Sequence, residues 1–560
     1  MSSSLVRVSS LLALVALGAC AGSTETGPAG AGGSNATAGT TGAAGTTGMG
    51  GTSGTAGTTG AAGTGTAGTG AAGTGGTTGV AGTSGAAGTG GTTGTAGTGG
   101  GTAGRGGTTG TAGTGGAAGR GGTTGTGGAA GRGGTTGTAG GSGTTGGGGA
   151  GGCTISATSS VGMIPTVGIV TFTTNLTGIT GAEIRFGPAA TGPTMTAPVD
   201  LTKASYRTLL LGMKASSTYM YRIVATSGAG TCTSPDFTIM TGALPTNVPK
   251  PTVTIMNAAA HYKGFVVTSS GISGTGAYIY DADGAPVWSS TGPNGTSRIQ
   301  MSWDGSKMYM MALNVQNSGA GAVKIIDMDG ANSTMASGMA ASHHDLTAIP
   351  GGYATLLWNS SGIDAPCSMV ERADSGTMTT IIANMNTVYN SSTWHTNSIH
   401  YYPSDNTYTL GDRNPNMYVK VSRTGQLIWQ LGGANPKDMS KFFSGAGTWS
   451  VNHGHHMTSD GTSFILFNNG AMTGGTSVVR AFKLNTATMT ATSSQTYMGG
   501  INSMVMGDAE FLPNGNILVT YSTNGTLQEV TSSGTVVAQF KFSALGYSEY
   551  RDSLYGQPPR

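Results

Sequence analysis

Short apolar runs separated by polar turns make up residues 250–560, and they follow a fixed spacing. A polar segment starts at Ser342, and eight positions after His344 a glycine, Gly352, opens the apolar run Tyr353 to Trp358. The same eight-residue spacing begins at Ser297, His395, His453 and Gly507. A turn followed by a short apolar run is typical of a β-hairpin. The spacing therefore predicts a series of similar β units.

A second set of polar turns, each with a small residue at its tip, recurs out of phase with the first. The six tips are Gly284, Gly330, Gly376, Gly425, Ala487 and Gly534, about 46 to 62 residues apart. Most of these turns lead into an apolar or β-branched run, which is a hairpin signal. A period of about 40 to 50 residues with several short strands per unit is typical of propeller blades. We predict a six-bladed β-propeller over residues 250–560.

A smaller β region precedes it. Between Cys153 and residue 243, alternating or β-rich runs lie at 168–173, 182–186 and 219–225, which predicts a sandwich of short strands. Residues 213–219 resemble the stretch before the tyrosine-corner strand of fibronectin type III domains, and 237–241 resemble their last strand. A linker with three prolines follows. The chain is thus predicted to be all-β, with a fibronectin type III-like sandwich at 153–243.

Composition sets apart residues 20–152. From Ser23 to Gly152 the chain is Gly, Thr and Ala almost throughout, and 104 glycines occur in the whole sequence. With few large apolar side chains this segment has no core to form, so we predict a disordered tether, with a glycosylated stalk as the alternative. The net charge is only +3 and Lys and Arg form no stripe, so no nucleic-acid partner is expected.

The N-terminal sequence is typical of an export signal. Residues 1–19 hold one Arg and a short apolar run, too short for a membrane span, and end in Leu17, Gly18 and Ala19 before Cys20. This ending resembles the lipobox of bacterial lipoproteins, in which the cysteine is lipidated. Ala21 favours an outer-membrane or cell-surface anchor. The alternative is an ordinary signal peptide with an incidental cysteine.

The remaining cysteines differ in context. Cys153 and Cys232 bracket the sandwich, and export makes a disulfide between them the expected state, with two unpaired buried thiols as the alternative. Cys367 is expected to be a lone thiol in a blade.

All eight histidines lie in the propeller region, and three of them share one repeat position. These are His344, His395 and His453. Equivalent positions in successive blades lie at equivalent radii around one axis, so the three side chains are predicted to converge in a central funnel.

At this point the chain resembles the bacterial arylsulfate sulfotransferases, six-bladed propellers preceded by a small β domain. The resemblance covers residues 250–545. It is carried by His343 to Asp345 with the Pro-Gly turn after them, by Trp394 to Ser398, by Leu410 to Arg413, and by Asn452 and His453 leading to Phe467 to Gly470. One departure is Gly454, where the family usually has an acidic residue.

The resemblance implies transfer of a sulfuryl group from a phenolic sulfate ester to a phenol, with no nucleotide sulfate donor, no cofactor and no metal. His453 is the candidate nucleophile, because a neutral imidazole can hold the group covalently. His344, His395 and Arg413 are candidate donors to the three charged oxygens, and Asn397 a further one. Trp394 is a candidate aromatic wall for the substrate.

Two other functions remain open at this stage. A three-histidine cluster can hold zinc in a hydrolase or lyase, although Arg413 would repel the metal. A surface propeller that binds ligands or partners without catalysis is the second, and Gly454 leaves room for it.

Overall fold

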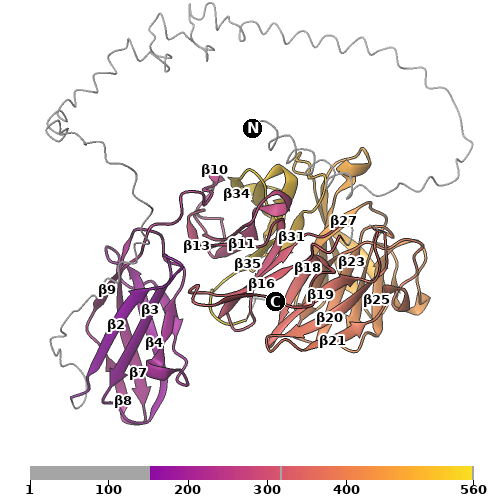
Figure 1. Ribbon diagram of the computed structural model, residues 1–560. Helices are drawn as coiled ribbons and strands as arrows, with labels where there is room; N and C mark the ends of the chain where they lie inside the picture. The colour runs from indigo at the N-terminus through magenta and orange to yellow at the C-terminus, as the bar shows by residue number, and fades with distance from the viewer. Residues whose placement is uncertain (1–151, 316–317, 363, 558–560) are drawn as a thin grey trace, which may run out of the picture. The chain divides into compact units, whose positions relative to one another are not determined.

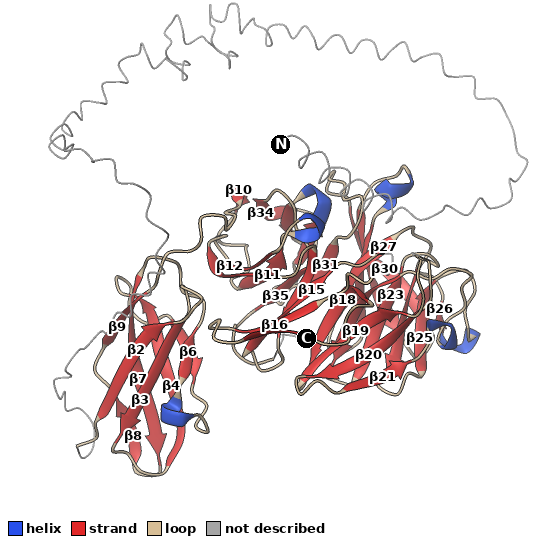
Figure 2. Cartoon of the chain, in the orientation of Figure 1, coloured by secondary structure: helices blue, strands red, loops and turns tan. Residues whose placement is uncertain are grey.

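The computed structural model describes residues 152–315, 318–362 and 364–557. The predicted export signal, Cys20 and nearly all of the predicted tether lie outside these residues. In the described part the chain forms strands almost throughout, and its helices are single short 3-10 turns at 204–206, 271–273, 385–387, 439–441, 470–473 and 522–524 (Figure 2). No described helix has the length and apolar character that crossing a membrane requires.

The N-terminal β region consists of two sheets around one core. One sheet is β2 (Ile155–Val161), β3 (Gly168–Thr174) and β6 (Thr208–Leu210); the other is β4 (Ile179–Pro188), β5 (Met195–Pro198), β7 (Thr218–Ser227), β8 (Gly230–Thr233) and β9 (Phe237–Met240). Alternate residues of both sheets, such as Val170, Phe172, Ile184 and Ile223, meet in a single apolar cluster. Alternation with period two places one face of each strand inside, which produces a sandwich.

Two features hold this sandwich together. The hydroxyl oxygen of Tyr219 accepts a hydrogen bond from the backbone N–H of Lys214 at 2.8 Å, which is the bond of a tyrosine corner. Cys153 and Cys232 are joined by a disulfide with a Cα–Cα distance of 6.1 Å.

Residues 252–551 form six blades, in which neighbouring strands are antiparallel apart from one parallel pair, 427–432 with 442–443. From the inner to the outer strand, the first blade is β35 (Ser548–Arg551), β11 (Phe265–Ser269), β12 (Gly276–Asp281) and β13 (Pro286–Thr291), and the second is β14 (Thr296–Met301), β15 (Lys307–Ala312), β16 (Val323–Asp327) and β17 (Ser333–Met335). The third is β18 (Ser342–Ile349), β19 (Gly352–Trp358), β20 (Cys367–Ala373) and β21 (Met378–Ile382), and the fourth is β22 (Thr396–Tyr402), β23 (Thr407–Asp412), β24 (Met417–Ser422), β25 (Leu427–Gly432) and β26 (Phe442–Phe443). The fifth is β27 (Asn452–Met457), β28 (Ser463–Asn468), β29 (Val478–Asn485) and β30 (Thr490–Tyr497). The sixth is β31 (Asp508–Phe511), β32 (Ile517–Tyr521), β33 (Thr526–Val530), β34 (Val536–Lys541) and β10 (Thr252–Met256). Figure 1 shows β18 to β21 side by side across one blade.

The six inner strands form a closed ring, because each contacts the next in the order β35, β14, β18, β22, β27, β31 and back to β35. The closure is made by both ends of the region. β35, from the C-terminal end, is the inner strand of the first blade, and β10, from the N-terminal end, is the outer strand of the last blade. The six-bladed propeller predicted from the sequence is confirmed.

Both sequence spacings have a structural meaning. The polar turns at Gly284, Gly330, Gly376, Gly425, Ala487 and Gly534 connect the third strand of each blade to the strand outside it. The eight-residue spacing runs from the start of an inner strand to the turn before the next strand. Its starting residues therefore lie around the axis.

Candidate active site

The repeat position at the start of the inner strands is marked by irregular pairing. The register shifts between Thr296 and Arg298 in β14, between His343 and Leu346 in β18, between Thr396 and Ser398 in β22, and between Asn452 and His455 in β27. A β-bulge re-aims a side chain out of the regular alternation. His344 also has φ 60°, in the left-handed region that is costly for residues other than glycine. The inner strands thus hold these residues in backbone conformations that depart from the regular alternation of a β-strand.

The structure brings together the four residues proposed as catalytic. His344 Nε2 lies 3.1 Å from His395 Nε2, and Arg413 Nη2 lies 3.4 Å from His395 Nδ1. The charge of Arg413 also acts on both His344 and His453. All four side chains are buried, so a charge that develops among them would be little screened by water.

Asp412 positions both His395 and Arg413. Its carboxylate accepts hydrogen bonds from the backbone N–H of His395 at 2.9 and 3.0 Å and from Asn414 N–H at 3.0 Å. Tyr389 also donates its hydroxyl to Asp412. The carboxylate therefore ties the segment before β22 to the turn after β23, where Arg413 lies.

The contacts among three histidines favour one arrangement of their protons. A guanidinium can only donate, so the facing His395 Nδ1 accepts and His395 Nε2 carries the proton. His395 Nε2 then donates to His344 Nε2, and His344 Nδ1 donates to His343 Nδ1 at 2.9 Å. The His343 Nε2–H ends the chain, buried and without a hydrogen-bond partner in the described part of the protein. Hydrogen bonds thus run in one direction from Arg413 to His343.

Burial keeps the rings of His343, His344 and His453 uncharged. It lowers the pKa of His343 to about 3, and it lowers the pKa of His344 well below 6.5, with further contributions from His343, His453 and Arg413. Burial, followed by the charge of Arg413, lowers the pKa of His453 to about 3. His453 is therefore a neutral imidazole at physiological pH. A neutral ring is the form that can act as a nucleophile.

The two predicted substrate-binding residues differ. Asn397 is fully buried beside the site; its amide donates to the Asn452 carbonyl at 2.8 Å, and its Oδ1 has no hydrogen-bond partner among the described residues. Trp394 packs against the apolar core between blades. The aromatic ring beside the histidines is instead Trp358, stacked on His343 at a centroid distance of 3.9 Å and 5.8 Å from His395.

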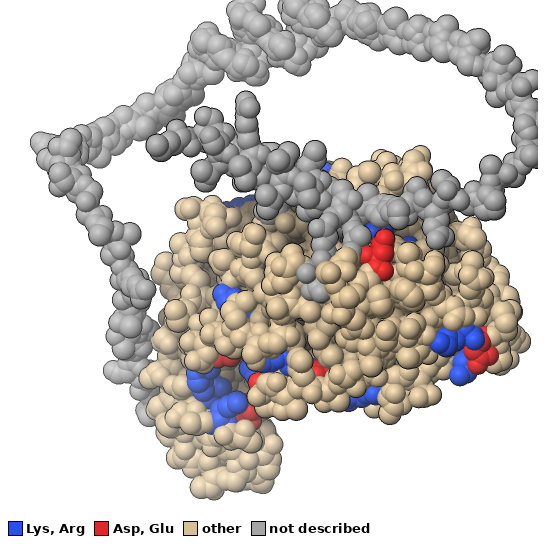
Figure 3. Space-filling model, turned by 45° about the vertical axis from the view of Figure 1, so that its right-hand side comes forward, with Lys and Arg blue, Asp and Glu red and all other residues tan. Residues whose placement is uncertain are grey.

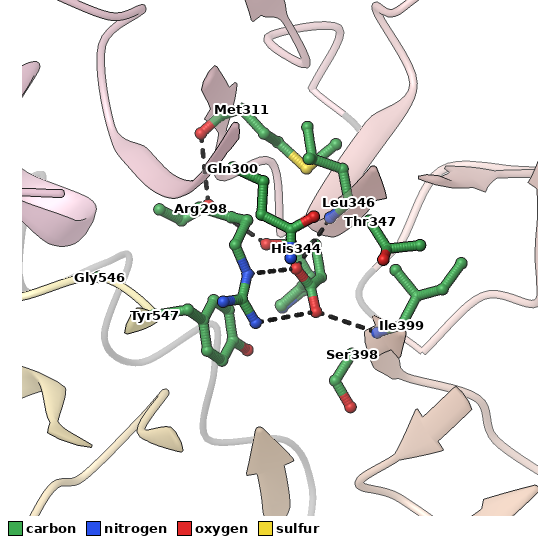
Figure 4. A network of polar contacts seen from close by, with 12 residues as sticks. Arg298, Gln300, Met311, His344, Leu346, Thr347, Ser398, Ile399, Gly546 and Tyr547 are labelled. Atoms are coloured by element: carbon green, nitrogen blue, oxygen red, sulfur yellow. Dashed lines mark hydrogen bonds and ion pairs between the residues drawn. The ribbon is translucent and has the colours of Figure 1, made fainter. Parts of the chain in front are cut away.

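A buried ion-pair network lies next to the site at the propeller centre, and Figure 4 shows its Arg298, with the Tyr547 ring beside the guanidinium. Arg298 Nε is 2.6 Å from Asp345 Oδ1, its Nη2 is 3.2 Å from Asp508 Oδ2, and its guanidinium carbon lies 4.5 Å from the centroid of the Tyr547 ring. Burial alone would lower the pKa of Arg298, but the two carboxylates raise it above its ordinary value. Asp345 Oδ2 also accepts from Ile399 N–H at 3.0 Å. The network joins inner strands of several blades.

This network explains why a glycine stands at position 454. A Cβ at this position would lie 2.1 Å from Asp508 Oδ1 and 2.7 Å from the carbonyl oxygen of Gly507. A carboxylate from the neighbouring blade thus fills the space into which a side chain at 454 would extend. Arg298, Asp345 and Asp508 each follow the repeat mark by one residue. That common offset is a sequence signal for the network, which a prediction of the axial histidines alone does not include.

No group of three or more His, Cys, Asp and Glu side chains within the described ranges is arranged to hold a metal ion. His344 and His395 face each other, whereas the Nδ1 of His453 faces Asn469.

Fold and site together define a six-bladed propeller with a buried histidine and arginine cluster on its axis. Residues 367–543 match the model of the arylsulfotransferase (ASST) family, which confirms the resemblance over that stretch. No curated protein matches the chain.

Solved structures are similar at low identity. The periplasmic gluconolactonase PpgL of Pseudomonas aeruginosa is 10% identical with a TM-score of 0.35, covering 52% of this chain and 99% of its own. The Swd1 β-propeller domain of Myceliophteria thermophila is 11% identical with a TM-score of 0.34, covering 54% and 88%. TolB of Acinetobacter baumannii is 9% identical with a TM-score of 0.34, covering 61% and 80%. Similarities of this size carry no information about function.

Proposed function

We propose that this protein is an arylsulfate sulfotransferase that moves a sulfuryl group from a phenolic sulfate ester to a phenol without a nucleotide sulfate donor. The family match supports a sulfotransferase-like function. The observation that carries the finer proposal is the neutral, buried His453 imidazole close to a fixed arginine and two further histidines. A nucleophile beside anion-binding donors is what a two-step transfer requires.

In the first step the Nε2 lone pair of His453 attacks the sulfur. The N–S bond forms as the bond between sulfur and the aryl oxygen breaks, and the electron pair leaves on the phenolate. Arg413 and the Nε2–H groups of His344 and His395, which no longer bond to each other once His344 Nε2 is protonated, stabilise the negative charge on the sulfuryl oxygens. In the second step the acceptor phenolate oxygen attacks the sulfur, and the electron pair of the N–S bond returns to His453.

Protons move through the His344 and His395 pair. In the empty site burial lowers the pKa of His344 and keeps its ring neutral, but an anionic sulfate ester favours a protonated imidazole nearby, so a proton enters with the donor. That proton passes to the leaving phenolate, and the same pair later takes the proton of the acceptor phenol. Asn397, whose buried Oδ1 has no hydrogen-bond partner among the described residues, is the further group that we propose to contact the bound substrate.

Substitution of His453 tests the proposal. The His453→Ala variant should lose transfer from 4-nitrophenyl sulfate while it still binds the donor, because Arg413, His344 and His395 remain. The Arg413→Ala variant should instead weaken both donor binding and turnover, by about a hundredfold or more, since it loses a charged donor from a desolvated site.

Kinetics of the wild type separate the alternatives. Two displacements predict ping-pong kinetics. Activity that is abolished by chelators and restored by zinc would support a metal-dependent hydrolase or lyase instead. Binding of phenols or sulfate with no turnover of any aryl sulfate would support a non-catalytic propeller.

We further propose that the protein is exported and held at the outer membrane or the cell surface by a lipid on Cys20. The proposal rests on the sequence before and at that cysteine.

A further inference from the structure

His453 has a second neighbour whose role is not explained by anion binding. Asn469, which directly follows β28, accepts a hydrogen bond from His453 through its Oδ1, 2.6 Å from His453 Nδ1. Both side chains are buried, with exposed fractions of 0% for Asn469 and 1% for His453. The backbone of Asn469 is also fixed, because its N–H donates to the Val451 carbonyl at 3.0 Å.

The orientation of the Asn469 amide is determined by its other contacts. Its Nδ2 lies 2.8 Å from the Ser503 carbonyl and 2.6 Å from the Met506 carbonyl. Carbonyl oxygens only accept, so the NH2 group must face them and the Oδ1 must face His453. An acceptor opposite Nδ1 requires the proton of the neutral ring to be on Nδ1, which leaves the lone pair on Nε2.

We propose that Asn469 is a positioning residue that sets the reactive tautomer of His453. This inference rests on the proposed function, because it assigns the Nε2 lone pair as the nucleophile. The ring keeps its Nδ1 proton while Nε2 bonds to sulfur, so the intermediate is an N-sulfo imidazolium. An amide oxygen accepts the hydrogen bond but does not take the proton, in contrast to a carboxylate.

Retention of this proton favours the second step. When the acceptor oxygen attacks the sulfur, the leaving group is a neutral imidazole with its proton on Nδ1. Without that proton the leaving group would be an imidazolate anion, which leaves far less readily. Asn469 thus acts in both halves of the reaction through His453 and does not itself contact the sulfuryl group.

Nitrogen NMR of protein whose histidines carry a nitrogen isotope label tests the tautomer directly. The His453→Gln variant assigns the signals of His453. Wild type should show His453 protonated at Nδ1 and unprotonated at Nε2 near neutral pH. After reaction with 4-nitrophenyl sulfate in the absence of acceptor, Nδ1 should still carry its proton. A wild-type ring protonated at Nε2 would overturn the inference, whether or not the protein transfers sulfuryl groups.

The Asn469→Leu variant removes the acceptor at similar volume. It should show a mixture of His453 tautomers and release the first equivalent of 4-nitrophenol about a hundredfold more slowly, with donor binding retained. Asn468→Leu is the matched control, because the Asn468 side chain accepts a hydrogen bond from Ser450 N–H at 3.3 Å, whereas the oxygen facing His453 Nδ1 belongs to Asn469. His453 in this control should have the same tautomer as in the wild type. An unchanged tautomer in Asn469→Leu would overturn the inference. If wild type shows the expected tautomer but transfers nothing, the proposed function fails and the assignment of the tautomer stands.

Discussion

The residues of the site are tuned by burial more than by charge. The acidic partner that commonly raises the pKa of an imidazole is replaced at His453 by a neutral amide, Asn469, and by the cation Arg413. At His343 burial is the cause of a pKa of about 3. The rings of His343 and His453 are therefore neutral, and each has a nitrogen lone pair that can act as a nucleophile or accept a hydrogen bond without prior loss of a proton.

This tuning predicts that stability falls in acid. Between the folded pKa of about 3 for His343 and His453 and the ordinary value of 6.5, the unfolded chain binds protons that the folded protein does not. The free energy of unfolding should therefore decrease as the pH falls through this window, by about 1.4 kcal/mol per histidine and pH unit. Urea unfolding between neutral pH and the acid end of the window measures it.

Asp412 acts in the opposite direction. Burial raises its pKa from 3.8 to about 6, so between these values the folded protein binds a proton that the unfolded chain does not. This adds stability as the pH falls, but it is one group against His343, His344 and His453. A free energy of unfolding that stays constant or rises on acidification would show that the histidines are not buried as neutral rings.

At the scale of the elements, Gly454 links two inner strands. Its N–H donates to the Gly507 carbonyl at 3.0 Å, and the Asp508 carboxylate lies where its Cβ would be. Gly454→Ala should therefore lower the free energy of unfolding by about 1–3 kcal/mol, because β27 and β31 must move apart. Gly181→Ala, where a Cβ meets no atom within 4 Å, is the control. Equal stability of both variants would contradict the packing at the axis.

Arg298 is the second link between elements. It is fully buried and paired with two carboxylates from different blades. Arg298→Met would leave Asp345 and Asp508 without their cation, and we expect a loss of about 3–5 kcal/mol in chemical denaturation. A loss below about 1 kcal/mol would mean that other donors satisfy these carboxylates.

Repetition made the elements predictable. The turns at Gly284, Gly330 and Gly376 and the eight-residue spacing from His344 each identified the same strands in successive blades, so blade number and the axial histidines could be predicted from local pattern. Contacts between particular side chains could not. Asp508 reaches Gly454 from the neighbouring blade, whereas Asn469 reaches His453, and Trp358 stacks on His343, within one blade, between consecutive strands whose pairing shifts register.

At the scale of the whole molecule, the propeller is closed by both ends of its own sequence, through β10 and β35. Charged side chains are few. On the face shown in Figure 3, basic and acidic side chains of the described residues lie next to each other in small groups. The negatively charged donors of the proposed reaction would therefore be bound by Arg413 and its neighbours inside the propeller more than attracted by the electrostatic potential of this face.

The proposed anchor gives a prediction at this scale. Cys20→Ser should move the protein from the membrane fraction to the soluble fraction, because the lipid is the one attachment that the sequence indicates. Activity toward 4-nitrophenyl sulfate should be unchanged, since the propeller is intact. Unchanged membrane retention on fractionation would contradict the lipid anchor.

The central claim is that His453 carries the sulfuryl group between donor and acceptor. The most direct test is to react the protein with 4-nitrophenyl sulfate without acceptor, quench it, digest it and examine the peptide that contains His453 by mass spectrometry. We predict one added sulfuryl group on His453. When a phenol is then added, this group should leave His453 and the sulfate ester of that phenol should form. Turnover of the donor with no label on His453, or with the label on another residue, would contradict this account.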